Sequence, residues 1–598
     1  MLLLWIATAL AAPEEAPPVE APPLEAPATE APAVEKQETE APETEVPEPA
    51  WHGTDPLKAA ADRVRAREEY KDADPSGFSE VDEAIAIDPD SGRERSELAP
   101  PADDAPLAVP IDAVPIDAVP ADAVPADAVP AEPPPARQVA AVPERIGTAE
   151  YYGAPGDLFL YNARVWDGVR PSAYKASVLI RGGVIEAISF DLDIPEDVRV
   201  IDASGMTIIP GLIDAHVHLT SIASSGYDEA EWESHVRQGL RAYLACGVTT
   251  VLDTGIQHEQ VARLRGWVAE GQPAPNFEVL GWVVSPPEGY VTTVLEGAPA
   301  HGTPEALTAH LDELTDLGAA GVKVTMEEGF LTRIWPLQTP EMQAVITREA
   351  DARDLPIYVH AISPKEHGLA MDMGAHAMVH PLDWPHRGTI NRLRETDTAV
   401  MSTIGIYDMF RVGYDRDRLT DPLTRLVVPE ALLANAADPA VKEGFQEEVM
   451  SIMMPKLPGM FSGLAEWQLN GRTPVERRIR SLEASVAELH RSGVTVIVGS
   501  DAGNWPILPS SFHGISTVRE LELWEEAGIS PLDTLTAATR LPAEVLGVSD
   551  RVGTLEPGKA ADLVVLEQNP LLDVSAVRAV RFTVKDGVAR TPEQWMND

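Results

Sequence analysis

The stretch TIIPGLIDAHVHL, residues 207–219, decides the fold of this chain. Its run of apolar and β-branched residues predicts a buried strand. His216 and His218 stand two positions apart near its carboxyl end. Residues i and i+2 of a strand face the same side, so both imidazoles should point into one cavity. Such a pair suits Zn²⁺ or a similar divalent ion, although an isolated His-x-His pair can equally be structural.

Beyond this stretch, short apolar runs alternate with amphipathic segments. The strand-like runs are VTTVLD, FEVLGWVV, AGVKVT, LPIYVHA, HAMVH, TAVMSTIG and VTVIVGSD, and helical segments such as ESHVRQGLRAYLA lie between them. Eight strands with intervening helices indicate an α/β fold, a (β/α)8 TIM barrel over residues 210–552. Strand-rich segments flank the barrel at 151–209 and 553–598, and together they predict a composite β-sandwich domain.

Four further residues with metal-binding chemistry lie at or near the carboxyl ends of predicted strands. They are Lys323 in AAGVKVT, His360 in PIYVH, His380 in HAMVH and Asp501 in VTVIVGSD. Barrel enzymes assemble their active sites at this end of the strands. A lysine in so apolar a strand is costly to bury without a partner, and a buried aspartate beside four histidines suits a metal ligand or base. Each residue alone has a structural explanation, so the prediction of a metal site rests on their joint placement.

Together these motifs resemble the amidohydrolase superfamily, and most closely its prolidase- and imidazolonepropionase-like branches. The resemblance rests on PGLIDAHVHL, GVTTVLDTG, Lys323, YVHA, GAHAMVHP, GSDAG and the tail AATRLPAEVLGVSDRVGTLEPGKAADLVVL, and it extends over residues 157–589. It implies two divalent metals, most simply Zn²⁺. By resemblance, His216, His218 and Asp501 bind the first metal, His360 and His380 bind the second, and a carboxylated Lys323 bridges them.

The resemblance also implies a reaction, the hydrolysis of a C–N bond in a small amide, a dipeptide, an acyl-amino acid or a cyclic amide. Two metals lower the pKa of a shared water, and Asp501 accepts its proton as the water attacks the carbonyl. Loops after the strands should contact the substrate. The candidates there are Tyr290, Glu327, Glu328, Tyr407, Arg411 and Trp505.

Two other interpretations remain open at this point. The same fold can hold a single metal, with Lys323 as a bystander, and perform deaminase or cyclic-imidate chemistry. A non-catalytic binding protein on a degenerate barrel is the third, although the full set of six candidate ligands argues against it. SPPEGYV around Tyr290 replaces the glycine-histidine motif that many prolidase-like relatives have after strand three, which leaves substrates other than dipeptides open.

The first quarter of the chain differs in composition from the rest. Residues 1–150 contain 25 of the 54 prolines, with 33 acidic against 10 basic residues. The Pro/Ala/acidic tracts at 13–50 and 100–150 should therefore be extended and disordered. Residues 1–12, MLLLWIATALAA, are typical of a secretory signal peptide and too short to span a bilayer. They predict export to the periplasm or medium, unless a misplaced start codon explains this apolar terminus.

Between the two tracts, residues 51–99 predict a short helical segment followed by a loop with EF-hand spacing. Its calcium candidates are Asp72, Asp74, Ser76, Phe78 through its carbonyl, and Glu83. No good second loop follows, so a solvated acidic turn is the alternative.

The charge balance and the cysteine count exclude several classes of function. A formal net charge of −49 leaves little basic surface to neutralise phosphates, which argues against nucleic acid as a partner. The single cysteine, Cys246, excludes an internal disulfide and a cysteine-based zinc cluster. A small-molecule substrate is the partner that the sequence favours.

Overall fold

The computed structural model describes residues 156–220, 229–295, 297–329, 334–438, 471–503 and 510–597, all in the compact unit Pro130–Asp598. The predictions that fall outside the described residues are the signal peptide (1–12), the acidic tracts (13–50 and 100–150), the segment 51–99 with Asp72, Asp74, Ser76, Phe78 and Glu83, and Trp505. These stay predictions. Among the described helices, none combines the length and the apolar character needed to cross a membrane.

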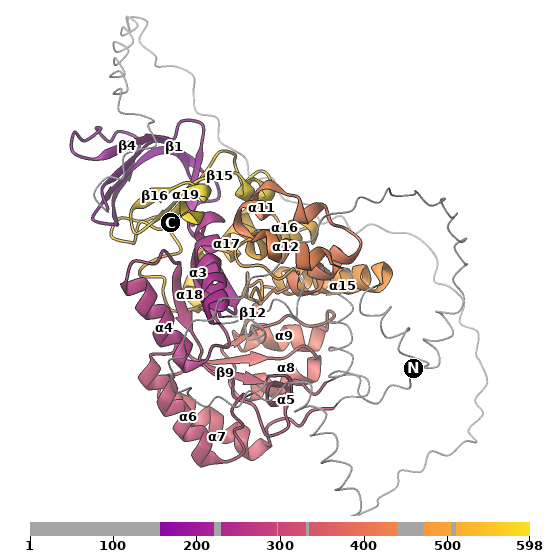
Figure 1. The fold of residues 1–598 in the computed structure, drawn as a ribbon. Helices are drawn as coiled ribbons and strands as arrows, with labels where there is room; N and C mark the ends of the chain where they lie inside the picture. Colours follow the sequence, from indigo (N-terminus) through magenta and orange to yellow (C-terminus); the bar gives the residue numbers. More distant parts are fainter. Residues whose placement is uncertain are drawn as a thin grey trace, which may run out of the picture. The chain divides into compact units, whose positions relative to one another are not determined.

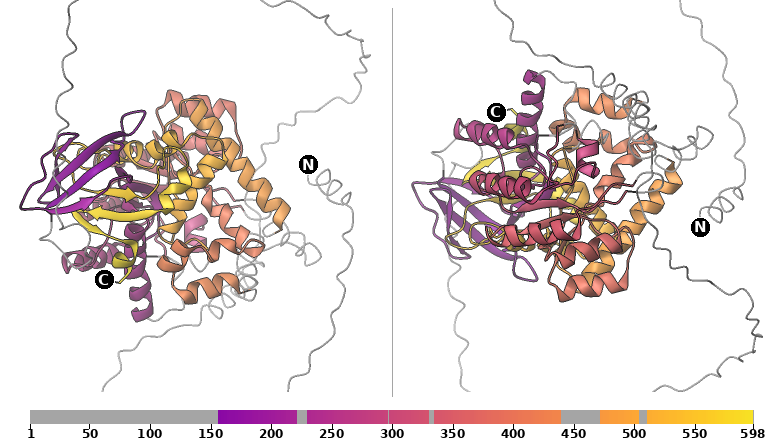
Figure 2. Two further views of the ribbon diagram at one scale, coloured as in Figure 1. Left: turned by 90° about the horizontal axis from the view of Figure 1, so that it is seen from above. Right: turned by 90° about the horizontal axis from the view of Figure 1, so that it is seen from below.

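Strands from both ends of the described chain form one mixed sheet of eight strands. The violet strands β1 and β4 and the yellow strands β15 and β16 lie side by side in Figure 1, and Figure 2 shows the same neighbourhood from two further sides. The order is β16-β15-β14-β5-β1-β2-β3, with β4 beside β1. The strands are β1 (Leu158–Val165), β2 (Tyr174–Arg181), β3 (Val184–Ser189), β4 (Arg199–Asp202), β5 (Thr207–Pro210), β14 (Leu563–Leu566), β15 (Val580–Lys585) and β16 (Val588–Arg590). Both flanking segments therefore contribute strands to one sheet.

The strands between these segments form two parallel sheets. One has the order β6-β7-β8 and the other β13-β12-β11-β10-β9. Backbone hydrogen bonds join the two sheets at both edges, from Ala215 N to Val498 O (2.9 Å) and from Val284 N to Lys323 O (2.8 Å). The strands are β6 (Leu212–Val217), β7 (Val248–Asp253), β8 (Asn276–Val279), β9 (Val322–Thr325), β10 (Ile357–His360), β11 (Ala377–Met378), β12 (Ala399–Met401) and β13 (Val496–Ile497).

Helices follow most of these parallel strands, and α4, α6 and α7 succeed one another along one side of them (Figure 1). Helix α6 shows why such segments are helical, because Thr303 caps its first turn and Gly318, with φ +66°, ends it. The α-helices are α3 (Glu229–Ala245), α4 (His258–Ala269), α5 (Tyr290–Val294), α6 (Pro304–Leu317), α7 (Pro340–Asp351), α8 (Pro364–Asp372), α9 (Arg387–Glu395), α10 (Gly405–Asp408), α11 (Pro422–Val427), α12 (Glu430–Ala437), α15 (Arg472–Arg491), α16 (Ile515–Glu526), α17 (Pro531–Ala537), α18 (Arg540–Val545) and α19 (Pro592–Met596). The 3-10 helices are η2 (Met409–Gly413), η3 (Asp417–Leu419) and η5 (Val574–Arg578).

The parallel strands bury side chains in two separate cores. One core gathers residues from both parallel sheets, among them Ile213, Leu252, Tyr358 and Met401, and the segment after α18 contributes Leu546. The other core packs the opposite side of the strands against the helices. Strands that are apolar on both faces are typical of parallel sheets covered by helices. This double burial fixes the direction in which the strand ends project.

The stretch 207–219 contains two strands where the sequence predicts one. β5 belongs to the flanking sheet, and β6 begins the parallel sheet two residues later. Pro210 has no amide hydrogen to donate. Gly211 packs so closely on Thr249 that a Cβ would lie 2.0 Å from its Oγ1. The chain passes from one sheet to the other at these two residues, so the prediction of one continuous strand is wrong.

Candidate metal centre

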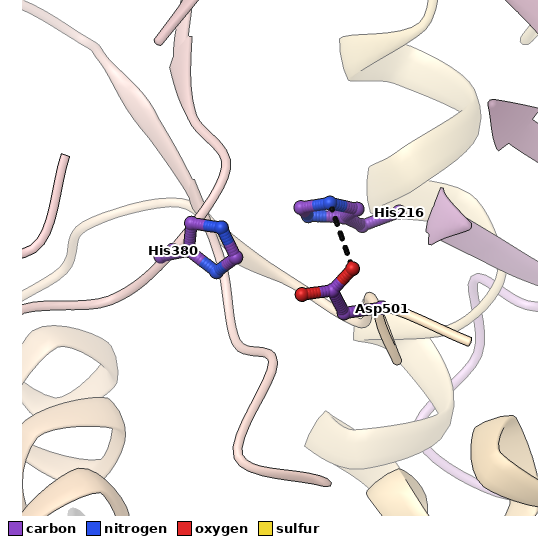
Figure 3. Close-up of side chains that lie close together, drawn as sticks. All are labelled: His216, His380 and Asp501. Atoms are coloured by element: carbon purple, nitrogen blue, oxygen red, sulfur yellow. Dashed lines mark ion pairs between the residues drawn. The ribbon is translucent and has the colours of Figure 1, made fainter. Parts of the chain in front are cut away.

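The carboxyl ends of the first and last parallel strands meet at an aspartate. His216 and His218 lie at the end of β6, and Asp501 follows β13 (Figure 3 shows His216 and Asp501). Asp501 Oδ1 is 3.0 Å from His218 Nε2 and 3.4 Å from His216 Nε2. The Asp501 backbone donates to His216 O at 2.8 Å, which holds the residue in place although its φ is +56°. A non-glycine residue in this region is strained, and such strain is concentrated at functional sites.

The Nδ1 atoms of His216 and His380 make hydrogen bonds that fix the orientation of both rings relative to the Asp501 carboxylate. His216 Nδ1 is 2.9 Å from Val379 O, and His380 Nδ1 is 2.9 Å from Thr403 Oγ1. A carbonyl oxygen only accepts, so the proton of a neutral His216 lies on Nδ1 and its Nε2 presents a lone pair. One donor atom each from His216, His380 and Asp501 lies within 4.8 Å of the others (Figure 3).

The charge states of His216, His380 and Asp501 make the site electron-rich. Burial lowers the pKa of His216 and of His380 well below the ordinary value, so both rings are neutral. Burial disfavours ionisation of Asp501, but His216 and His218 outweigh it and hold the pKa of the carboxyl below its ordinary range. An imidazole lone pair and a carboxylate oxygen that face each other are both acceptors, and a divalent cation between them satisfies both. The donor set therefore fits a metal ion.

His360 and Lys323 complete the group of six. His360 ends β10, and its ring centroid is 4.5 Å from that of His380. Lys323, within β9, is 4% exposed. Burial lowers its pKa to about 7, although Asp501 and Asp253 favour the charged amine. The structure thus brings four imidazoles, one carboxylate and one buried amine together at or near the carboxyl ends of the parallel strands.

Asp214, which the sequence reasoning missed, supports this group of side chains. Asp214 is fully buried and accepts hydrogen bonds from the His216 amide (3.2 Å), the Ser500 hydroxyl (2.6 Å) and the Thr517 hydroxyl (2.6 Å). It ties β6 to the segment before Asp501. Its signal was present in the sequence, because Asp214, His216 and His218 follow one another at the two-residue period of a strand.

The predicted substrate contacts have different surroundings. The Tyr290 ring stacks on His360 with centroids 5.2 Å apart, and Glu327 Oε2 is 3.4 Å from His360 Nε2. Tyr407 accepts a hydrogen bond from Arg478. Arg411 is instead held by Glu476 and Asp408, and Glu328 pairs with exposed Lys365. Among the predicted contacts that the structure describes, Tyr290 and Glu327 lie directly against His360 of the candidate centre.

Comparisons with known proteins identify the family of the chain and relate its fold to solved structures. The sequence profile of the Amidohydrolase family matches residues 207–590, more than half of the chain. The chain belongs to the amidohydrolase family. A dihydroorotase of Syntrophotalea carbinolica is 28% identical over 433 residues, which cover 69% of this chain and 89% of the relative. A dihydroorotase of Pelobacter propionicus is 24% identical over 208 residues, 34% of this chain and 42% of that protein, so this match spans less than half of the relative.

Among solved structures, this family member is similar to a Xaa-Pro dipeptidase crystallised with methionine in its active site. The TM-score is 0.56 at 19% identity, and the match covers 73% of this chain and all of the dipeptidase. At this identity the likeness concerns the fold. The fold prediction of an amidohydrolase-type α/β protein is confirmed.

Proposed function

We propose that this chain is a metal-dependent hydrolase that cleaves a C–N bond in a small-molecule amide, peptide or cyclic amide. The observation that supports it is the convergence of neutral His216 and His380 on ionised Asp501, with His218, His360 and Lys323 beside them. Family membership agrees with this assignment. Relatives named dihydroorotase act within the same reaction class.

We assign the six residues to two divalent ions. His216, His218 and Asp501 would hold one ion, His360 and His380 the other, and a carboxylated Lys323 would bridge them. Nitrogen and carboxylate donors favour Zn²⁺. A buried amine with a lowered pKa supports the bridge, because only the neutral amine adds CO₂.

The architecture that we propose around this centre is a closed (β/α)8 barrel with a two-layered composite sandwich. The backbone hydrogen bonds that join the two parallel sheets at both edges support closure. The eight-stranded sheet formed by both flanking segments supports a composite domain. A barrel would place all six side chains at its carboxyl-terminal mouth, where barrel enzymes position their catalytic groups.

The side chains of this chain would then perform the following steps. Metal ions held by these residues would supply Lewis-acid chemistry, activating a water and polarising the substrate carbonyl. The ionised carboxylate of Asp501 accepts a proton from the attacking water and passes it to the leaving nitrogen. Burial raises the pKa of Tyr290, so its hydroxyl stays protonated and can donate to the carbonyl oxygen as negative charge develops there.

A single-metal enzyme is the second candidate, and one observation favours it. The compact trio of donors consists of His216, His380 and Asp501, whereas His360 lies against the Glu327 carboxylate. A site of this kind would need no carboxylated lysine. It would suit a deaminase or an imidazolonepropionase-like hydrolase.

An activity screen with metal analysis tests both candidates. The full chain, loaded with Zn²⁺, is assayed on N-acyl amino acids, X-Pro and other dipeptides, and small lactams, while bound metal is counted. We expect hydrolysis with about two ions per chain; one ion per chain would select the single-metal candidate. Asp501→Asn should lose about 10²- to 10⁴-fold in kcat as a lost general base does, while most of the metal remains bound. Wild-type activity in that variant would refute the role of Asp501.

A further inference from the structure

Glu520, on α16, is a buried acid whose two carboxylate oxygens both accept hydrogen bonds from one short segment. The residue is 0% exposed. Its Oε1 accepts from the Ser402 hydroxyl (2.5 Å) and the Ile404 amide (3.0 Å), and its Oε2 accepts from the Gly405 amide (2.6 Å). Burying a carboxylate is costly unless hydrogen bonds replace its water. These three donors supply that replacement and bind the helix to the segment that follows β12.

The donors to Glu520 come from both sides of Thr403, whose hydroxyl is 2.9 Å from His380 Nδ1. Ser402 precedes Thr403 and Ile404 follows it. Thr403 has a φ of +35°, which is unfavourable for a β-branched residue. Such a conformation persists only when the surroundings hold it. The bonds to Glu520 hold the chain on either side, so their loss would let Thr403 relax and would move its hydroxyl away from His380.

The same helix also contacts the support of the other histidine in the compact trio of donors. Thr517 lies one turn before Glu520 and donates to Asp214 at 2.6 Å. Asp214 in turn accepts from the His216 amide at 3.2 Å. One turn of α16 therefore binds the support of His216 and, through Glu520, the segment that supports His380. A helical turn is rigid, so it can fix the separation of these two rings, whose centroids are 4.9 Å apart (Figure 3).

We propose that Glu520 is a positioning residue of the candidate metal centre, which sets the zinc affinity by holding Thr403 against His380. The inference rests on the proposed metal-dependent function and adds a residue that acts through Thr403 rather than through contact with the metal. The alternative is a purely structural role, in which Glu520 only ties α10 to α16. That role predicts a loss of stability whose effect on zinc binding is independent of Thr403.

Glu520→Gln tests this role with almost no change of shape. Glutamine keeps one acceptor oxygen and replaces the other with an NH2 group, which only donates. In either orientation at least one buried backbone amide loses its acceptor, which is unfavourable. The zinc affinity of the full chain should fall about 10- to 100-fold, the usual effect of losing support for a metal-bound histidine. Chelator competition measures it at about pH 8, because burial raises the pKa of Glu520 to about 7 and the carboxylate is mostly ionised there.

A double-mutant cycle with Thr403→Val separates the two roles. If Glu520 acts through the Thr403 hydroxyl, removing that hydroxyl leaves nothing further for Glu520→Gln to disturb. The double variant should then bind zinc within about threefold of Thr403→Val, close to the accuracy with which independent effects add. Independent roles would multiply the two losses to about 10²- to 10⁴-fold. Glu525→Gln is the matched control, because it makes the same charge change at a partly exposed position of the same helix.

Ser402→Ala provides a second readout if Glu520→Gln does not fold. It removes one of the three donors, so we expect a smaller loss of zinc affinity and the same lack of additivity with Thr403→Val. Wild-type zinc affinity in the folded variants, or multiplied losses in the double variant, would overturn the inference and leave the proposed function standing. Zinc binding without hydrolysis of any amide would overturn the proposed function alone. Absence of zinc binding by the wild type would overturn both.

Discussion

Replacing Thr403 with valine should weaken metal binding without touching a metal ligand. Thr403 Oγ1 is 2.9 Å from His380 Nδ1, and His380 is 7% exposed. A ring that binds a cation through Nε2 must have its proton on Nδ1, so the threonine hydroxyl is the acceptor of that proton. Valine has the same branched shape and removes this acceptor. Because φ of Thr403 is +35°, the backbone strain of a β-branched residue is the same in both proteins.

The expected loss follows from that one unsatisfied donor. A buried N–H without a partner costs about 1–3 kcal/mol, and loss of such a supporting hydrogen bond typically lowers metal affinity by about 10- to 100-fold. The two figures agree, because each tenfold change in affinity is about 1.4 kcal/mol. Competition with a chromogenic zinc chelator measures the dissociation constant directly.

Thr403→Ser is the control for this experiment. Serine keeps the hydroxyl and removes the methyl group, so the zinc affinity should stay within about threefold of wild type, the range of a neutral contact. Thermal unfolding of both metal-free variants checks that the fold is intact. The reasoning fails if Thr403→Val binds zinc as tightly as wild type, or if Thr403→Ser loses as much affinity as Thr403→Val.

Two further predictions concern stability. In Gly503→Ala the new Cβ would lie 2.0 Å from His218 O, at φ +104°. The control is Gly558→Ala, because Gly558 has a similar φ of +97° and no neighbour within 4 Å of a Cβ. We expect Gly503→Ala to lower the unfolding free energy in urea by about 1–3 kcal/mol more than the control does, and equal losses in the two variants would contradict the clash. Burial lowers the pKa of His310 to about 3, so between about pH 6.5 and 3 the unfolded chain binds a proton that the folded chain does not, and stability falls as the pH falls. His310→Gln removes this contribution and should reduce the loss of unfolding free energy between pH 6.5 and 5 by about 2 kcal/mol; an unchanged pH dependence would show that His310 does not titrate this way.

Much of the candidate site could be predicted because its signals are local. A short apolar run that ends in His-x-His or in a single histidine indicates both a strand and a possible metal ligand within a few positions. Lys323 is conspicuous for the same reason, since its neighbours in β9 are apolar. The boundary inside residues 207–219 was missed, because whether β5 continues into β6 depends on its pairing with the distant strand β14.

Sequence reasoning could not predict which partners bind the side chains outside the strands. Arg411 and Arg478 have the same side-chain chemistry. Arg411 lies in η2 and Arg478 lies in α15. Carboxylates bind Nε and both terminal nitrogens of Arg411, whereas Arg478 Nε has no hydrogen-bond partner among the described residues. Nothing in the neighbouring residues distinguishes them, since Glu476 and Asp383 reach them through tertiary packing.

The sequence by itself determined the alternation of strands and helices, the residue types of the candidate metal centre and the unusual composition of the first 150 residues. These follow from hydrophobic periodicity and side-chain chemistry, which act over a few residues. Only the tertiary structure decided that Asp214 and Thr403 support the histidines and that β14 pairs with β5. Each of these depends on which distant segments pack together, and packing is a property of the whole fold.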